Sequence, residues 1–287
     1  MKKTKEKVKV QSLKFSLREI CKYFNKSSQA FYKSELSKNK LKFQEEIIVK
    51  LVLDYKRELP NTGGRKLFVD LLDDFKKLGF KIGRDKFFAI LRKNNLLMKK
   101  KRKQSKTTNS NHWYKKYKNL IKDLEITKAN QVFVSDITYI RVNDHFLFLS
   151  LITDYYSRKI VGYCLNNNLT VQGPLNALKM ALKNVKEPKE LIHHSDRGIQ
   201  YCCKEYTGIL ISKGIQISMT EENHVYENAV AERVNGILKN ELSLGETFLS
   251  NEIAHKAVKQ AIRLYNEKRL HMSLNYKRPA EVYSQAA

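Results

Sequence analysis

The sequence predicts an α/β protein in which a helical region precedes a mixed β-sheet with helices on its faces. Three observations predict this class. Apolar residues recur at helical spacing in residues 1–98, three segments rich in β-branched and aromatic residues follow from residue 131, and helical and strand patterns then alternate. We therefore expect three parts: a helical region at 1–98, a linker at 99–128 and an α/β core with a C-terminal helix at 129–287.

The helical region contains two candidate helix-turn-helix motifs. In the first, apolar residues repeat at helical spacing over residues 17–24, the pattern is then interrupted, and Ser27 or Ser28 can cap a second helix. In the other, between Gly64 and Leu97, RKLFVDLLDDFKKLGF predicts one helix and RDKFFAILRKNNLL the next. Either second helix could enter a DNA major groove. Each pair could equally be an ordinary helical hairpin.

Most of the excess positive charge lies in one half of the chain. The net charge is +26; residues 1–130 carry 36 basic and 13 acidic side chains (+23), whereas residues 131–287 carry 19 and 16 (+3). Such a basic excess is typical of a nucleic-acid partner, because lysine and arginine release counterions from phosphates. A solubilising surface or affinity for anionic lipid is the alternative, but no amphipathic membrane helix accompanies the charge. The charge thus favours DNA binding by at least one helical motif.

The expected linker is the most basic stretch. Residues 99–118, KKKRKQSKTTNSNHWYKKYK, contain nine basic and no acidic side chains and show no apolar periodicity. Lysines interleaved with Trp113, Tyr114 and Tyr117 suit a DNA backbone and exposed bases. Alternatively, Trp113 packs against the next domain.

The core begins with strands. QVFVSDITYI, HFLFLSLITD and RKIVGYCLN are separated by turn sequences and predict a three-stranded antiparallel meander. A helix (VQGPLNALKMALKNV), a strand (LIHHSD), a helix (KEYTGILISKG), a strand (IQISMT) and a helix from about Ala229 follow. Three strands followed by alternating helices and strands predict a mixed sheet with helices on its faces.

Three carboxylates stand at informative positions in this core. Asp136 interrupts the apolar row of the first strand, where a charge persists only if it is paired or bound to a cation. Asp196 closes the strand LIHHSD, and the carboxyl end of such a strand faces a ligand crevice. Glu232 lies on the polar face of the helix AVAERVNGILKNEL. Three other polar residues share that face: Asn228, Asn235 and Lys239.

The spacing of these carboxylates and their surroundings point to one family. There are 59 residues between Asp136 and Asp196 and 35 between Asp196 and Glu232, as in the DDE recombinases. The segments VFVSDITYI, HHSDRGIQY and YENAVAERVNGILKNEL resemble the catalytic boxes of the integrase-like transposases encoded by the second reading frame of two-frame bacterial insertion sequences. YNEKRLHMSLNYKRPAEVY is similar to the C-terminal signature of these relatives of retroviral integrases, and GGRKL with GFKIGRDKFFAILRKNNLL to their helix-turn-helix.

The resemblance implies a ribonuclease-H-like integrase core with a five-stranded sheet. It implies a DDE transposase, a metal-dependent polynucleotidyl transferase that cleaves insertion-sequence ends and uses the free 3′-OH in strand transfer. Two Mg²⁺ ions, with Mn²⁺ as a substitute, would be held by the three carboxylates, Asp136 bridging both and Asp196 and Glu232 each holding one. The partners implied are double-stranded DNA (the terminal inverted repeats and the target), further copies of the chain, and an upstream-frame protein as fusion or associate.

Residues expected to contact DNA lie on the second helix of the second motif, in the linker and on the Glu232 helix. They are Arg84, Lys86, Lys99, Lys100, Lys101, Arg102, Lys103, Asn228, Asn235 and Lys239. Of the two histidines before Asp196, we expect one to point into the core and one toward the cleft, and neither to transfer a proton.

Two other functions remain open at this point. A ribonuclease-H-like nuclease would hydrolyse nucleic acid without joining it, because fold and metal site alone do not separate the two activities. A helix-turn-helix regulator with a degenerate core is a second alternative, against which the three intact carboxylates argue. No secretory signal or apolar membrane stretch is visible, so we expect a cytoplasmic, nucleoid-associated bacterial protein with reduced cysteines and no membrane partner.

Overall fold

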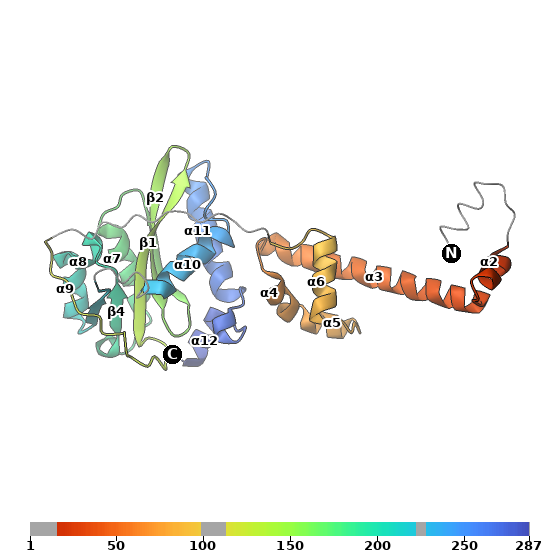
Figure 1. The fold of residues 1–287 in the computed structure, drawn as a ribbon. Helices are drawn as coiled ribbons and strands as arrows, with labels where there is room; N and C mark the ends of the chain where they lie inside the picture. Colours follow the sequence, from red (N-terminus) through yellow and green to blue (C-terminus); the bar gives the residue numbers. More distant parts are fainter. Residues whose placement is uncertain (1–15, 99–112, 222–227, 287) are drawn as a thin grey trace. The chain divides into compact units, whose positions relative to one another are not determined.

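A computed structural model describes residues 16–98, 113–221 and 228–286 (Figure 1). The chain forms two units, the first made of residues 1–54 and 71–96 and the second of residues 55–70 and 97–287. The second unit therefore includes a segment, 55–70, from within the predicted helical region. Lys99–Lys103 of the expected linker lie outside the described residues.

The first unit contains helix α2 (Leu17–Tyr23), most of α3 (Ser28–Glu58), α5 (Leu72–Lys77) and α6 (Arg84–Lys93). A capping box starts α2, in which Ser16 and Glu19 each accept a hydrogen bond from the other's backbone. The predicted cap of the next helix is also present, since Ser27 Oγ accepts from the backbone N–H of Ala30 at 3.1 Å. Both helices of the first candidate motif are thus confirmed.

The second candidate motif differs from its prediction at one point. A single helix was expected over residues 65–80, but the chain forms α4 (Gly64–Asp70) and α5, separated at Leu71. The break coincides with the boundary between the units, because the Asp70 carboxylate accepts hydrogen bonds from Tyr55 and Arg278 of the second unit, both at 2.8 Å. Downstream, Gly79 (φ 68°) permits the left-handed turn before α6. Whether α6 enters a DNA groove stays a prediction.

The second unit is built on a five-stranded sheet. Its strands are β1 (Val132–Val142), β2 (His145–Asp154), β3 (Ile160–Asn166), β4 (Ile192–Ser195) and β5 (Gln216–Met219), in the order β3-β2-β1-β4-β5. The pairs β1–β2 and β2–β3 are antiparallel, whereas β1–β4 and β4–β5 are parallel. The predicted meander and the mixed five-stranded sheet are confirmed.

Helices cover both faces of this sheet (Figure 1). On one side lie α10 (Ala229–Asn240) and α11 (Asn251–Glu267), which bury Ile140 and Leu149 of the β1–β2 pair. On the other side α7 (Gln172–Leu182), α8 (Ile199–Cys202) and α9 (Lys204–Ser212) enclose Phe133 and Ile152. Because side chains alternate along a strand, Asp136 is on the α10 side, two residues from Val134, which packs with Ala231 of α10.

The described part of the expected linker lies along the sheet. The backbone N–H of Met219 donates to the carbonyl of Lys118 at 3.3 Å, and Leu120 N–H donates to Ser218 Oγ at 2.9 Å. Further along, Ile121, Leu124 and Ile126 pack against the cluster around Val132 and Val134. We call residues 113–127 the strap, since they run from the edge strand β5 to the start of β1.

The C-terminal segment fastens several parts of the second unit together. It comprises α11, a 3₁₀ turn (Met272–Leu274) and α12 (Pro279–Ala286). The Asn266 side chain accepts from Ile160 N–H and donates to Ile160 C=O, at 2.9 and 3.0 Å, which extends the pairing of β3. The Tyr283 hydroxyl donates to Asn130 Oδ1 at 2.7 Å, beside the entry to β1.

A buried charge cluster joins this segment to α4 and to the end of α10. Glu241 follows α10 and accepts two hydrogen bonds from the Arg269 guanidinium, at 2.9 and 2.8 Å, and one from Lys66 Nζ of α4 at 2.5 Å. Only 6% of the Arg269 side chain and 9% of Lys66 are exposed. Burial by itself raises the pKa of Glu241, but the hydrogen bonds and charges of Arg269 and Lys66 outweigh it and lower that pKa.

In the three described ranges, we find no helix that is both long and apolar enough to cross a membrane.

The charge cluster yields a stability prediction. Replacing Arg269 by Met should lower the free energy of unfolding by about 3 kcal/mol, because Glu241 loses its bidentate partner in a buried place. The matched control is Lys268→Met, since Lys268 pairs with Glu58 at 3.5 Å with both side chains more than half exposed. That change should lower it by less than about 1 kcal/mol. Urea unfolding measures both, and equal losses in the two variants would contradict the assignment.

Candidate active site

The first carboxylate, Asp136, is fixed on the central strand of the sheet. Its Oδ1 accepts from the Ile137 backbone N–H at 2.8 Å, and its Oδ2 accepts from the Asn235 side-chain amide of α10 at 2.7 Å. Burial, and then the negative charge of Asp196, raise the pKa of Asp136 to about 7; the hydrogen bonds act in the opposite direction and Glu232 adds a smaller increase. The carboxyl group is thus held in a place that disfavours its ionised form.

The strand register brings the second carboxylate beside the first. Ser135 of β1 pairs with Ser195 of β4 in the parallel ladder, so that Asp136 and Asp196 each follow a paired residue. The Asp196 Oδ1 accepts from Gly198 N–H at 3.0 Å, and a Cβ on Gly198 would lie 2.9 Å from that same oxygen. A side chain at position 198 would therefore force the Asp196 carboxylate to shift. Asp196 was predicted to close its strand; it lies at the carboxyl end of β4, one residue after the last strand residue, Ser195.

Glu232 reaches the site from the first turn of α10 and is exposed. Its charge contributes to the raised pKa of Asp136, behind those of burial and Asp196. Within residues 16–98, 113–221 and 228–286, no three carboxylate, imidazole or thiol side chains are gathered closely enough to hold one metal ion. Asp136 and Asp196 therefore form the fixed part of the site, and Glu232 lies at its margin.

Two of the residues expected to contact DNA lie inside the protein instead. Asn228 and Asn235 are buried, and their amides donate to the Ser135 carbonyl (3.0 Å) and to Asp136 (2.7 Å). Both side chains thus fasten α10 to β1, and the DNA contacts expected of them are not supported. Of the predicted polar face of α10, the two asparagines thus bond to β1, whereas Glu232 stays exposed.

Lys239 lies two turns beyond Glu232 and is half-buried. Burial lowers the pKa of Lys239, while the negative charge of Asp136 acts in the opposite direction. The ammonium group is therefore within electrostatic reach of the carboxylate site. Its contact with DNA stays a prediction.

The two histidines before Asp196 both point into the interior. His193 Nε2 lies 2.6 Å from Ser135 Oγ and 2.9 Å from the Tyr206 hydroxyl, and His194 Nδ1 lies 2.8 Å from Ser218 Oγ. Burial, with a smaller effect of His194, lowers the pKa of His193 to about 3, so that this ring is neutral at pH 7. The expectation that one histidine faces the cleft was wrong, because the short strand β4 is covered on both faces. That neither transfers a proton stays a prediction.

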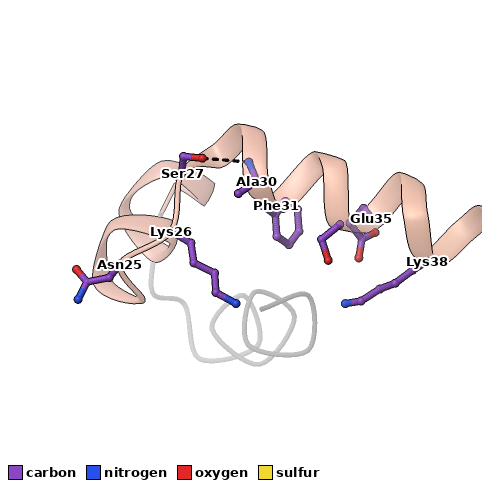
Figure 2. A pocket seen from close by; sticks show the side chains of 8 residues that line it. Asn25, Lys26, Ser27, Ala30, Phe31, Glu35 and Lys38 are labelled. Atoms are coloured by element: carbon purple, nitrogen blue, oxygen red, sulfur yellow. Dashed lines mark hydrogen bonds between the residues drawn. The ribbon is translucent and has the colours of Figure 1, made fainter.

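The first unit carries the other described residues expected to contact DNA. Arg84 and Lys86 lie exposed in the first turn of α6, where Arg84 pairs with Asp85 at 3.0 Å. A hollow on the same unit lies beside the turn between α2 and α3 (Figure 2). Its lining includes two lysines, Lys26 and Lys38, which make it a poor cation site.

The chain is similar to known proteins along most of its length. Residues 126–224 and 213–279 match two family models, both described as an integrase core domain. The chain is 33% identical over 276 residues to the insertion element IS600 uncharacterized 31 kDa protein of Shigella sonnei, covering 93% of this chain and 100% of that protein. It is 31% identical over 203 residues to the transposase InsF for insertion sequence IS3A of Escherichia coli (strain K12), covering 70% of each.

Among solved structures, the chain is similar to the catalytic core domain of HTLV-2 integrase, which was solved in complex with magnesium. The TM-score is 0.44 at 19% sequence identity, over 54% of this chain and 97% of that one. The family itself is shown by the sequence relatives, one of which matches along its whole length. The chain therefore belongs to the integrase-core transposases of bacterial insertion sequences, together with the InsF proteins of the IS3 elements.

Proposed function

We propose that this transposase cuts DNA at the ends of its insertion sequence and joins each 3′ end to target DNA, with Asp136, Asp196 and Glu232 as the catalytic residues. One observation carries the proposal: the parallel register of β1 and β4 sets two carboxylates side by side at a partly buried place. Such an arrangement destabilises the fold unless a cation balances the charge. It is therefore better explained by catalysis than by stability.

The donor set supports Mg²⁺, with Mn²⁺ as a substitute, because carboxylate oxygens are the ligands that these hard cations prefer. Asp136, Asp196 and Glu232 would hold two ions. When bound, such ions neutralise charge on the scissile phosphate and activate the attacking hydroxyl. The raised pKa of Asp136 supports this fit, since burial and then the negative charge of Asp196 disfavour its ionised form, which a bound cation would stabilise.

The protein's own residues orient this site. The Asn235 amide fixes the rotation of the Asp136 carboxylate, and Asn228 holds the start of α10, and with it Glu232, against β1. We infer that Lys239 binds a phosphate of the terminal nucleotides, because it lies on the same face of α10 as Glu232, two turns further along, and within electrostatic reach of Asp136. Phosphate binding by lysine is electrostatic and independent of sequence.

Sequence-specific recognition of the terminal inverted repeats is assigned to residues 1–130, which contain the first unit and the expected linker. The net charge of +23 in residues 1–130 supports this, as do Arg84 and Lys86 on α6 and the linker residues Lys99–Lys103. Because the two ends of the element must be processed together, we expect several copies of the chain to assemble on DNA. An upstream-frame protein would join them as a fusion or associate. Such an enzyme would act at the bacterial nucleoid.

The first prediction concerns the three carboxylates. Asp136→Asn, Asp196→Asn and Glu232→Gln should each lower cleavage and joining at least about a thousandfold, because each removes a metal ligand without changing volume. Binding to the ends, measured by gel shift, should stay near wild type. Asp144→Asn, in the exposed β1–β2 turn, is the matched control and should keep full activity. Cleavage without joining in the wild-type protein would favour the nuclease alternative.

A second prediction concerns metal removal. The pKa of Asp136 is raised from 3.8 to about 7, so its ionised form opposes folding, and stability is lost through this group as pH rises through that range. In EDTA, Asp136→Asn should therefore melt at a higher temperature than wild type at pH 8, with the difference shrinking toward pH 5. Adding Mg²⁺ should raise the melting temperature of wild type more than that of the variant. Equal responses to Mg²⁺ would count against Asp136 as a ligand.

A third prediction concerns Lys239. Lys239→Ala should reduce joining and lower the slope of log affinity against log salt by about one, the loss of a single phosphate contact. Lys239→Arg should restore most of both. Lys256→Ala, on the exposed face of α11, is the control and should change neither. Wild-type joining and salt dependence in Lys239→Ala would show that this lysine only favours the helix end.

A further inference from the structure

The strap places an aromatic pair on the surface of the second unit. Trp113 stacks on Tyr114 with ring centroids 4.3 Å apart and planes inclined by 23°, and 82% of Trp113 is exposed. Tyr114 and Tyr117 pack against the buried cluster under α8 and α9, which includes Tyr206. The aromatic residues of the strap therefore differ in their surroundings. The tyrosines pack against the core, whereas the tryptophan stays on its surface and is available for stacking.

The strap reaches the sheet close to the catalytic carboxylates. Lys118 C=O accepts from Met219 N–H at the carboxyl end of β5, and β5 is parallel to β4, the strand that leads to Asp196. Cys202 Sγ of α8 lies 3.6 Å from the sulfur of Met219. The Cys202 thiol is also within electrostatic reach of both Asp196 and Lys116. The part of the strap around Lys118 thus lies at the carboxyl end of β5, next to the strand end that leads to Asp196.

The charges next to the tryptophan all have one sign. Three exposed lysines, Lys115, Lys116 and Lys118, occur among six consecutive residues, and no acidic side chain interrupts them. Lys115 Nζ lies 5.1 Å from the centre of the Tyr117 ring. A flat exposed ring backed by a second ring, with cations at its side, matches the chemistry of an unpaired nucleobase and its phosphates.

We propose that Trp113 is a stacking platform for an unpaired base next to the scissile phosphate, with Lys115 and Lys116 holding the backbone of that strand. This rests on the proposed function, because it takes the nearby carboxylates to act on DNA. A base inside a duplex has both faces covered by its neighbours, so the platform needs a base that has left the stack, as in a strand that is open at this point. The occupant is single-stranded DNA at the element end.

The chain contains one tryptophan, so its fluorescence reports on this platform alone. The full-length Asp136→Asn protein is titrated with an oligothymidylate and with a blunt duplex hairpin of unrelated sequence. We expect the oligothymidylate to quench the fluorescence and the hairpin to leave it largely unchanged. Quenching by both equally, or by neither, would overturn the proposal. This measurement needs no strand joining, so it can fail or succeed independently of the proposed function.

A variant series provides the second readout. Trp113→Ala should weaken binding of a hairpin with a short single-stranded tail by roughly 5- to 150-fold, the range for loss of one stacked base. It should leave binding of the blunt hairpin unchanged, and Trp113→Phe should recover part of the loss. Phe146→Ala, at an exposed aromatic of the β1–β2 hairpin, is the matched control and should bind like wild type. Equal affinities of Trp113→Ala and the control for the tailed hairpin would contradict the platform.

Discussion

The repulsion between Asp136 and Asp196 is the constraint on which the rest of the site depends. Two carboxylates on neighbouring parallel strands, one of them largely shielded from water, oppose folding when both are ionised. The surrounding residues make this arrangement tolerable rather than favourable: one amide from Asn235 and one backbone N–H stabilise Asp136. In the proposed function, metal ions brought in with the DNA phosphate balance the remaining negative charge.

The helix that carries Glu232 and Lys239 is held at both ends. At its start, the Asn228 amide bonds to β1, and just after its end Glu241 is held by Arg269 and Lys66. A 1 Å displacement of a catalytic group can reduce a rate a hundredfold, roughly, so such fastening matters for chemistry as well as stability. It also gives the C-terminal signature a physical role, because Arg269 and Asn266 of that segment hold α10 and β3 in place.

Much of this architecture could be predicted from the sequence, because strands and helices carry local patterns. The segments rich in β-branched residues predicted the three-stranded meander, and a serine at position 27 or 28 predicted the helix cap that Ser27 makes. What could not be predicted depends on distant partners: Lys66 and Glu241 are separated by 175 positions, so no local pattern indicates their contact. Likewise, periodicity placed Asn235 on a polar face, but an amide that faces solvent and one that bonds to Asp136 give the same pattern.

The most direct test of the account is the position of a bound divalent cation. Crystals of the protein soaked in Mn²⁺ and measured at the manganese absorption edge would show it as an anomalous difference peak. We predict a peak in contact with the carboxylates of both Asp136 and Asp196, which disappears in Asp136→Asn crystals treated in the same way. A peak bound elsewhere, or no peak at these residues under conditions in which the enzyme joins DNA, would contradict it.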